Sequence, residues 1–140
     1  MIDIQQAIRN IRDTKENQEE FQEVLLDIPK FVGMLFYYRD MLHLCHLSTE
    51  SYSTHKALNS LYDDLLDFID TLVETSQTQE ILNIEIPSSS STKDAIGLVE
   101  NLLSFVKSNR YVFPYSFQQN VLDEIESAVS KTIYKLKFLK

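Results

Sequence analysis

The fold of this chain is decided by residues 52–77, which read YSTHKALNSLYDDLLDFIDTLVETSQ. Apolar side chains recur there every three or four residues, the spacing at which they share one face of an α-helix. These apolar positions are Leu58, Leu61, Tyr62, Leu65, Phe68, Ile69 and Leu72. The polar residues 49–53 are suited to cap the start of a helix, and the pattern fades after Thr75. The stretch therefore predicts one long amphipathic helix.

The segment before this helix has the same spacing. Apolar residues keep a helical period from Phe21 to the first histidines, and Pro29 interrupts them. Proline is tolerated in the first turn of a helix but not in its interior, so we expect a kink or a fresh helix at Pro29. The first twenty residues carry a shorter amphipathic pattern. We therefore predict an N-terminal helical arm over residues 1–20 and one bundle domain over residues 21–140.

Two further helices are predicted after a long link. Residues 81–91 combine a short apolar alternation with a proline and a run of serines, which is typical of a crossing loop. Ser91 with Asp94, and Ser116 with Gln119, have the spacing of capping boxes and would open the third and fourth helices. Only two glycines and three prolines leave little turn chemistry for a β architecture. The prediction is an all-α, ferritin-like four-helix bundle with a long crossover between helices 2 and 3.

The composition favours a cytoplasmic protein that does not span a membrane. It also works against sequence-independent binding to nucleic acid. No run of about 20 apolar residues is present, and the first residues lack a basic region followed by an apolar one. A single cysteine, Cys45, excludes an intrachain disulfide and favours a reducing compartment. The net charge of −8 works against binding to the phosphates of DNA. The last ten residues run the other way, with four lysines and no acid, which we interpret as cations at the end of a helix dipole.

Four side chains of this chain have the chemistry of metal ligands. Asp70 and Glu74 lie one helical turn apart and can chelate together. His55 is on the same helix but roughly 22 Å from Asp70 along the axis, at about 1.5 Å per residue. We expect His43 at the end of the preceding helix, folded back beside His55 by a turn at residues 46–49. One ion bound by all four would take two histidines from one subunit and two carboxylates from another, so this hypothesis demands a homo-oligomer.

The same residues carry a resemblance to a known family. Residues 36–74 resemble the iron-binding core of the Dps family, the small DNA-protecting ferritins. In that family one histidine closes the first helix, and an aromatic residue and a second histidine open the second helix. An aspartate and a glutamate follow on that helix. This chain has the same intervals at His43, His55, Asp70 and Glu74. The other matching residues are Leu42, Tyr52, Leu61, Tyr62, Asp63 and Val73.

The resemblance implies a non-haem iron site with ferroxidase activity at a twofold interface between subunits, in a dimer or in a closed dodecamer. Imidazole nitrogen and carboxylate oxygen suit Fe(II), and acidic ligands offset the charge of Fe(III). Residues 131–136 are similar to uncharacterised Dps-like viral proteins, which implies a bacteriophage protein in the host cytoplasm. The chain departs from the family at Asn59, where an acidic ligand is usual, and at Leu44, which replaces a common tryptophan.

Other interpretations stay open at this stage. The departure at Asn59 favours a non-catalytic helical-bundle interaction module that keeps the fold without metal chemistry. Compaction of DNA would need the lysine-rich end of the chain to be free. His46 is interpreted as a capping or surface residue before an extra ligand, and the acidic surroundings of Cys45 argue against a reactive thiolate.

Overall fold

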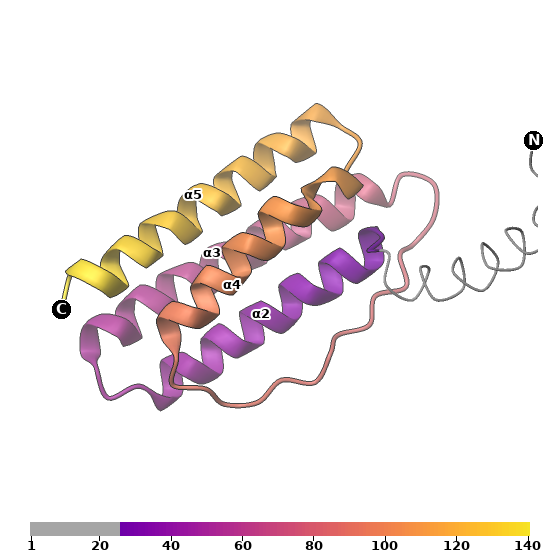
Figure 1. Cartoon of the computed structure of the whole chain (residues 1–140). Coiled ribbons are helices and arrows are strands. Elements are labelled where there is room, and N and C mark those ends of the chain that lie inside the picture. The colour runs from indigo at the N-terminus through magenta and orange to yellow at the C-terminus, as the bar shows by residue number, and fades with distance from the viewer. Residues whose placement is uncertain (1–25) are drawn as a thin grey trace, which may run out of the picture.

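The described part of the computed structural model, residues 26–140, consists of four long α-helices and no β-strand (Figure 1). The elements are α2 (Ile28–Ser48), α3 (Tyr52–Ser76), α4 (Ala95–Asn109), the short 3-10 helix η1 (Arg110–Val112) and α5 (Ser116–Phe138). The arm predicted over residues 1–20 lies outside the described residues, as do the first five residues of the predicted bundle domain. The all-α prediction is confirmed for the residues that the structure describes.

Helices α2 and α3 begin where their caps place them. Asp27 accepts a hydrogen bond from the Lys30 backbone N–H at 2.9 Å, and Pro29 lies in the first turn of α2. Of the two possibilities expected at Pro29, a new helix is therefore confirmed and a kink is not present. Ser51 caps α3 by accepting from the Thr54 backbone N–H at 3.3 Å. The prediction of one unbroken helix over residues 52–77 is confirmed to within one residue.

Both predicted capping boxes are wrong in detail. The cap of α4 is Asp94 itself, whose carboxylate accepts from the Gly97 backbone N–H at 3.0 Å, and Ser91 lies in the preceding link. The residue before α5 is Tyr115, which makes no capping bond. The side-chain amide of Gln119 is used elsewhere, because it donates to two backbone carbonyls of the α4–α5 turn.

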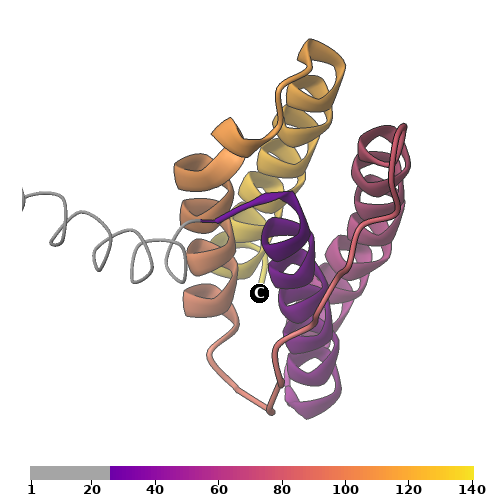
Figure 2. The same ribbon diagram turned by 90° about the vertical axis from the view of Figure 1, so that its right-hand side faces the viewer.

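The four helices pack in a closed ring. Helix α2 lies against α3, α3 against α5, α5 against α4, and α4 against α2. The long link between α3 and α4, residues 77–94, runs back along the outside of α2 (Figures 1 and 2). As a result, α3 and α4 point in the same direction, whereas α2 and α3 are antiparallel. The predicted long crossover between the second and third long helices is therefore present.

The link approaches α2 most closely at Gly33. A Cβ atom built on this buried glycine would overlap the backbone carbonyl oxygen of Glu85 in the link. Glycine is thus required at this position because the backbone of the link occupies the space of a side chain. Ile84 of the link also packs against the core.

One contiguous core fills the space between the helices. Six of the seven apolar positions predicted on α3 are buried, and Phe68 is half-buried. Replacing a fully buried leucine of this kind by alanine typically costs about 2–5 kcal/mol. The largest fully buried apolar side chains are Phe31, Leu35, Leu42, Leu58, Leu61, Leu65, Ile69, Leu72, Leu102, Leu122 and Ile125. None of the helices within residues 26–140 has the length and apolarity needed to cross a membrane.

Candidate metal centre

Two histidines close the turn between α2 and α3. The Nδ1 atom of His46 lies 2.7 Å from the backbone oxygen of His55, and the Nδ1 atom of His55 lies 2.8 Å from the backbone oxygen of His46. Their rings stack with centroids 3.6 Å apart and planes 20° apart. The imidazole that stacks directly on His55 is therefore that of His46, and the ring centroid of His43 lies 5.9 Å from that of His46. His46 makes this contact because it lies about one turn nearer the end of α2 than His43 does.

The reciprocal bonds fix the tautomer of both rings. A carbonyl oxygen can only accept, so Nδ1 carries the hydrogen in His46 and in His55. The Nε2 atom of each neutral ring then holds the lone pair that a metal ion binds. Metal-binding histidines commonly donate their other ring nitrogen to a backbone carbonyl in this way. His46 is only 7% exposed, so its interpretation as a surface residue is wrong, whereas His55 is half-buried.

The third histidine, His43, packs in the same group of rings. His43 stacks on Tyr62 of α3, with centroids 4.5 Å apart and planes 21° apart, and its ring centroid lies 5.9 Å from that of His46. The Arg39 guanidinium lies over Tyr62 at 5.9 Å from the ring centroid. Three histidines and a tyrosine from two helices therefore form one packed group at this end of the bundle. We call His43, His46, His55 and Tyr62 the ring cluster.

Asn59 is tied to the ring cluster by hydrogen bonds. Tyr62 donates its hydroxyl hydrogen to the Asn59 side-chain oxygen at 2.7 Å. The Asn59 amide in turn donates to the Asp63 carboxylate at 3.4 Å. The Asn59 side chain is thus engaged within its own helix.

The two carboxylates of the predicted site lie at the other end of α3. Asp70 and Glu74 are both exposed, one helical turn apart. Because α3 is unbroken from Tyr52 to Ser76, the helix rise still separates Asp70 from His55 by roughly 22 Å. Within residues 26–140 of one chain, no group of three or more His, Cys, Asp or Glu side chains is close enough to hold a metal ion. The predicted ligands are therefore not brought together inside one molecule.

Burial raises the pKa of two weakly acidic side chains, Tyr62 of the ring cluster and Cys45 of α2. Burial raises the pKa of the Tyr62 hydroxyl, and the charge of Asp63 raises it further, while that of Arg39 lowers it. Burial also raises the pKa of the Cys45 thiol, with a smaller contribution from Asp94. Cys45 is fully buried. A thiol held in its protonated form is a poor nucleophile, so the structure agrees with the sequence in disfavouring a reactive Cys45.

Sequence reasoning missed the importance of His46 and Tyr62. The available signal was the spacing around the turn, since His46 and His55 flank residues 47–54, which contain the helix end and the new cap. Tyr62 lies seven residues after His55, about two helical turns along α3, and was assigned to the buried stripe and to the family resemblance but not to the site. Periodicity alone does not separate a residue that only packs in the core from one that also belongs to a site.

The described residues thus form an all-α four-helix bundle with a histidine-rich ring cluster at one end. The chain belongs to the family of unknown function DUF5856, whose model matches residues 46–136. That match begins at His46 and includes His55, Asp70 and Glu74, but it does not include His43. No curated protein and no solved structure matches the chain.

Proposed function

We propose that this protein binds iron between two copies of the chain, as a Dps-like member of the ferritin-like superfamily. His43 and His55 of one subunit would supply nitrogen ligands, and Asp70 and Glu74 of a second subunit would supply oxygen ligands. The assembly is at least a homodimer and, if the shell closes, a dodecamer. His46 is a positioning residue, because it bonds to His55 and stacks on its ring.

The observation that carries this proposal is the length and direction of α3. One straight element holds His55 near its start and the two carboxylates near its end. A second copy that packs antiparallel across a twofold axis would bring the start of one α3 to the end of the other. Each such dimer would contain two equivalent sites. The long link of the bundle, with α3 and α4 in the same direction, is a connection that ferritin-like folds also use, and it supports this proposal.

The side chains present fit a divalent metal. The Nδ1 bond of His55 leaves its Nε2 atom unprotonated in the neutral ring, which is the form that binds metals. Asp70 and Glu74 are exposed and make no ion pair among residues 26–140, so both carboxylates are accessible to a neighbouring subunit. Two imidazoles and two carboxylates form a ligand set suited to iron. Bound Fe(II) would supply electrons to dioxygen or peroxide, which is the ferroxidase reaction.

The test is an anaerobic Fe(II) titration of the purified chain combined with a measurement of its molar mass in solution. We expect the unaltered protein to bind iron and to be at least a dimer. The double variant Asp70→Ala with Glu74→Ala should lose iron binding and remain folded, because both side chains are exposed. Addition of air to the iron-loaded protein then measures oxidation through the absorbance of Fe(III).

The matched control removes two other carboxylates from the same helix. Asp64 and Asp67 are exposed residues of α3, and neither is a proposed ligand. Their double alanine variant changes the net charge by the same amount and should bind iron as the unaltered chain does. Equal iron binding by both double variants would contradict the proposal.

Asn59 favours a second candidate function, a helical-bundle module that engages another protein without metal chemistry. Its side chain stands where the resemblance expects an acidic ligand, and it is bonded to Tyr62 and near Asp63. The exposed acids of α3 would then be the contact surface for a partner. A monomer that binds no Fe(II) in the titration described above would support this candidate and exclude the first.

A further inference from the structure

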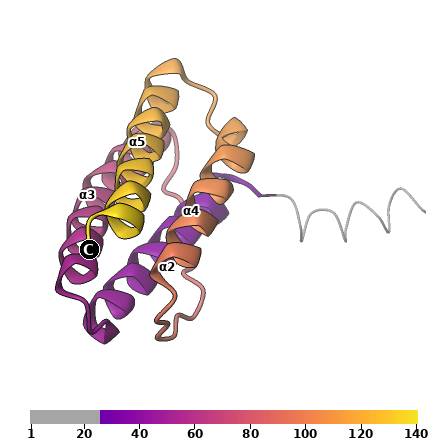
Figure 3. The same cartoon turned by 60° about the vertical axis from the view of Figure 1, so that its left-hand side comes forward.

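A cavity between the start of α3 and the end of α5 lies apart from the ligands proposed for iron. It has a volume of about 320 Å³ and is lined by Tyr52, Ser53, Lys56, Ala57, Ser60, Lys135 and Leu139. Helices α3 and α5 run side by side, and the end of α5 lies beside the start of α3 (Figure 3). The volume is at the lower end of the range typical of small-molecule sites.

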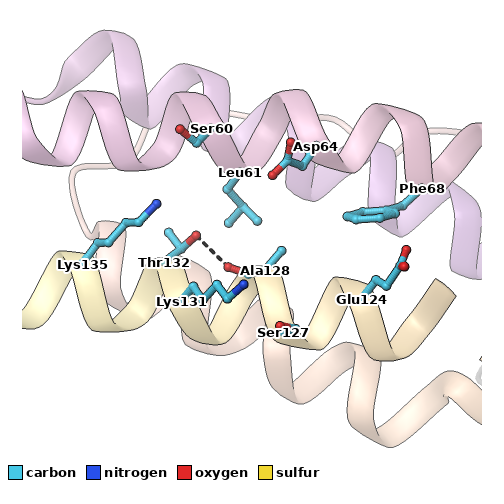
Figure 4. Close-up of a pocket in the computed structure, with 10 residues that line it drawn as sticks. All are labelled: Ser60, Leu61, Asp64, Phe68, Glu124, Ser127, Ala128, Lys131, Thr132 and Lys135. Atoms are coloured by element: carbon cyan, nitrogen blue, oxygen red, sulfur yellow. Dashed lines mark hydrogen bonds between the residues drawn. The ribbon is translucent and has the colours of Figure 1, made fainter. Parts of the chain in front are cut away.

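A second cavity continues the first along the same two helices. Ser60 and Lys135 line both cavities, and the second has a volume of about 440 Å³. Figure 4 shows Lys135 reaching from α5 toward α3 at one end of it, with Phe68 and Glu124 at the other end. Lys131 also lines this second cavity, as does Asp64. The two cavities together form one groove, basic at the end near Tyr52 and mixed in charge beyond it.

The basic end of the groove carries charge that the chain does not neutralise. Lys56 and Lys135 line the first cavity, and none of its lining residues is acidic. Among residues 26–140, neither lysine makes an ion pair, although the chain has an excess of eight acids over bases. By contrast, Lys137, two residues after Lys135, pairs with Glu100 at 2.8 Å. Two unpaired cations that face one cavity repel each other, and an anion bound between them removes that repulsion.

The same cavity offers an aromatic and apolar wall. The Tyr52 side chain is 75% exposed, and the Lys56 ammonium lies 5.8 Å from its ring centroid. Leu139, which directly follows α5, is 49% exposed. The hydroxyl groups of Ser53 and Ser60 also line the cavity, although the Ser60 hydroxyl donates to the Lys56 carbonyl at 3.3 Å and the Ser53 hydroxyl lies 3.1 Å from that of Ser51. Exposed apolar side chains beside unpaired cations suit a ligand that is anionic at one end and flat or apolar at the other.

We propose that this cavity binds a small phosphate-bearing ligand with an aromatic body, such as a nucleoside diphosphate. Lys56 and Lys135 contact the phosphates, with Lys131 within the adjoining part of the groove. Tyr52 and Leu139 contact the aromatic body, since a planar base stacks well on an exposed tyrosine ring. The site uses none of the residues proposed to bind iron, so this proposal does not depend on the proposed iron function.

The test is an isothermal titration of the full chain at low salt with three probes. ADP carries both halves of the proposed ligand, pyrophosphate carries only the charge, and adenosine carries only the aromatic body. We expect ADP to bind most tightly, pyrophosphate more weakly and adenosine least. Binding of ADP should weaken as salt is added, because the lysines are exposed and their charges are screened. Absence of ADP binding at millimolar concentration would overturn the proposal.

Two pairs of variants separate this cavity from a general effect of charge. Lys135→Ala should weaken ADP binding about tenfold, the usual loss for one hydrogen bond to a charged group. Lys137→Ala removes the same charge from the same helix end and should leave ADP binding unchanged, because Lys137 lines neither cavity. Equal losses in the two variants would overturn the proposal.

The second pair tests the aromatic wall. Tyr52→Ala should weaken binding of ADP but not of pyrophosphate, whereas Tyr111→Ala removes an exposed tyrosine elsewhere and should change neither. A short single-stranded DNA that binds while ADP does not would also count against the proposal, since it would indicate a surface for polymers rather than a site for a small ligand.

Discussion

At the α2–α3 turn and at the α4–α5 turn, two residues nine positions apart bond to each other's backbone carbonyl. His46 and His55 do so through Nδ1 at the first turn. At the second turn, Arg110 donates to the Gln119 carbonyl at 2.9 Å, and the Gln119 amide donates to the Arg110 carbonyl at 2.8 Å. Each pair fastens the end of one helix to the start of the next antiparallel helix.

The two turns differ in what remains after this bonding. The Arg110 guanidinium also pairs with Asp123 at 2.6 Å and with Glu126, so its charge is neutralised within the chain. The imidazoles of His46 and His55 each keep one ring nitrogen without a partner among the described residues. The polar groups of Arg110 are therefore used for contacts within the chain at the α4–α5 turn, whereas the α2–α3 turn holds two imidazoles in place and leaves one nitrogen of each ring without a partner among the described residues.

The largest expected effect comes from the structural turn. Arg110→Met should lower the free energy of unfolding by about 3 kcal/mol, because it breaks two ion pairs and leaves the half-buried Glu126 carboxylate unpaired. Urea denaturation followed by circular dichroism measures this loss. A loss below about 1 kcal/mol would mean that the guanidinium network contributes no more than an exposed ion pair.

A smaller loss is expected at the histidine turn, with a second consequence. His46→Ala should lower the free energy of unfolding by about 1–2 kcal/mol, through one lost hydrogen bond and lost ring packing. Iron affinity should also fall about 10–100-fold, the usual effect of removing a residue that orients a metal ligand. Gln119→Ala is the control, since it removes the corresponding side chain of the other turn. It should lower stability at least as much, because three hydrogen bonds are lost, without changing iron affinity.

The smallest effect concerns alkaline pH. The pKa of the Cys45 thiol is raised in the folded chain by burial and by Asp94, from an ordinary value of 9.0. Folding therefore favours the protonated thiol, and this contribution to stability is complete below pH 9 and is lost as the pH rises further. Stability should fall there by at most about 1.4 kcal/mol per pH unit for one proton.

The variant Cys45→Ala isolates this contribution. It should show a shallower fall in stability above pH 9 than the unaltered chain, whereas the fall that begins above pH 10 should remain, because burial also raises the pKa values of Tyr38 and Tyr62. Denaturation curves at a series of pH values measure both slopes. If stability falls with pH equally steeply in the two proteins just above pH 9, ionisation of Cys45 does not contribute to this fall.

The bundle could be predicted from sequence because its signal is repeated along every helix. Leu58, Leu65 and Leu72 lie at intervals of seven residues, and a helix that buries one of them must bury all three. Single contacts carry no such repetition. From the sequence, Asp94 fits two roles, the cap of α4 or the fourth residue of a capping box that begins at Ser91. These two roles place the start of the helix three residues apart.

The candidate site was only partly predictable for a related reason. His55, Asp70 and Glu74 lie on one helix, so their spacing fixes their relative positions. The partner of His55 comes from another helix, and the geometry of the turn decides between His43 and His46. Three residues move a side chain by most of a helical turn, and the capped turn at Ser51 brings His46 against His55. Periodicity within one helix contains no information on that choice.

The most direct test of the central claim is complementation between two defective variants. One chain carries His43→Ala with His55→Ala, and the other carries Asp70→Ala with Glu74→Ala. Each alone should bind no iron. When both are coexpressed with different tags and mixed dimers are isolated through both, one of the two sites in each dimer keeps all four ligands. These mixed dimers should bind about half as much Fe(II) as the unaltered dimer, whereas mixed dimers that bind none would contradict a site shared between subunits.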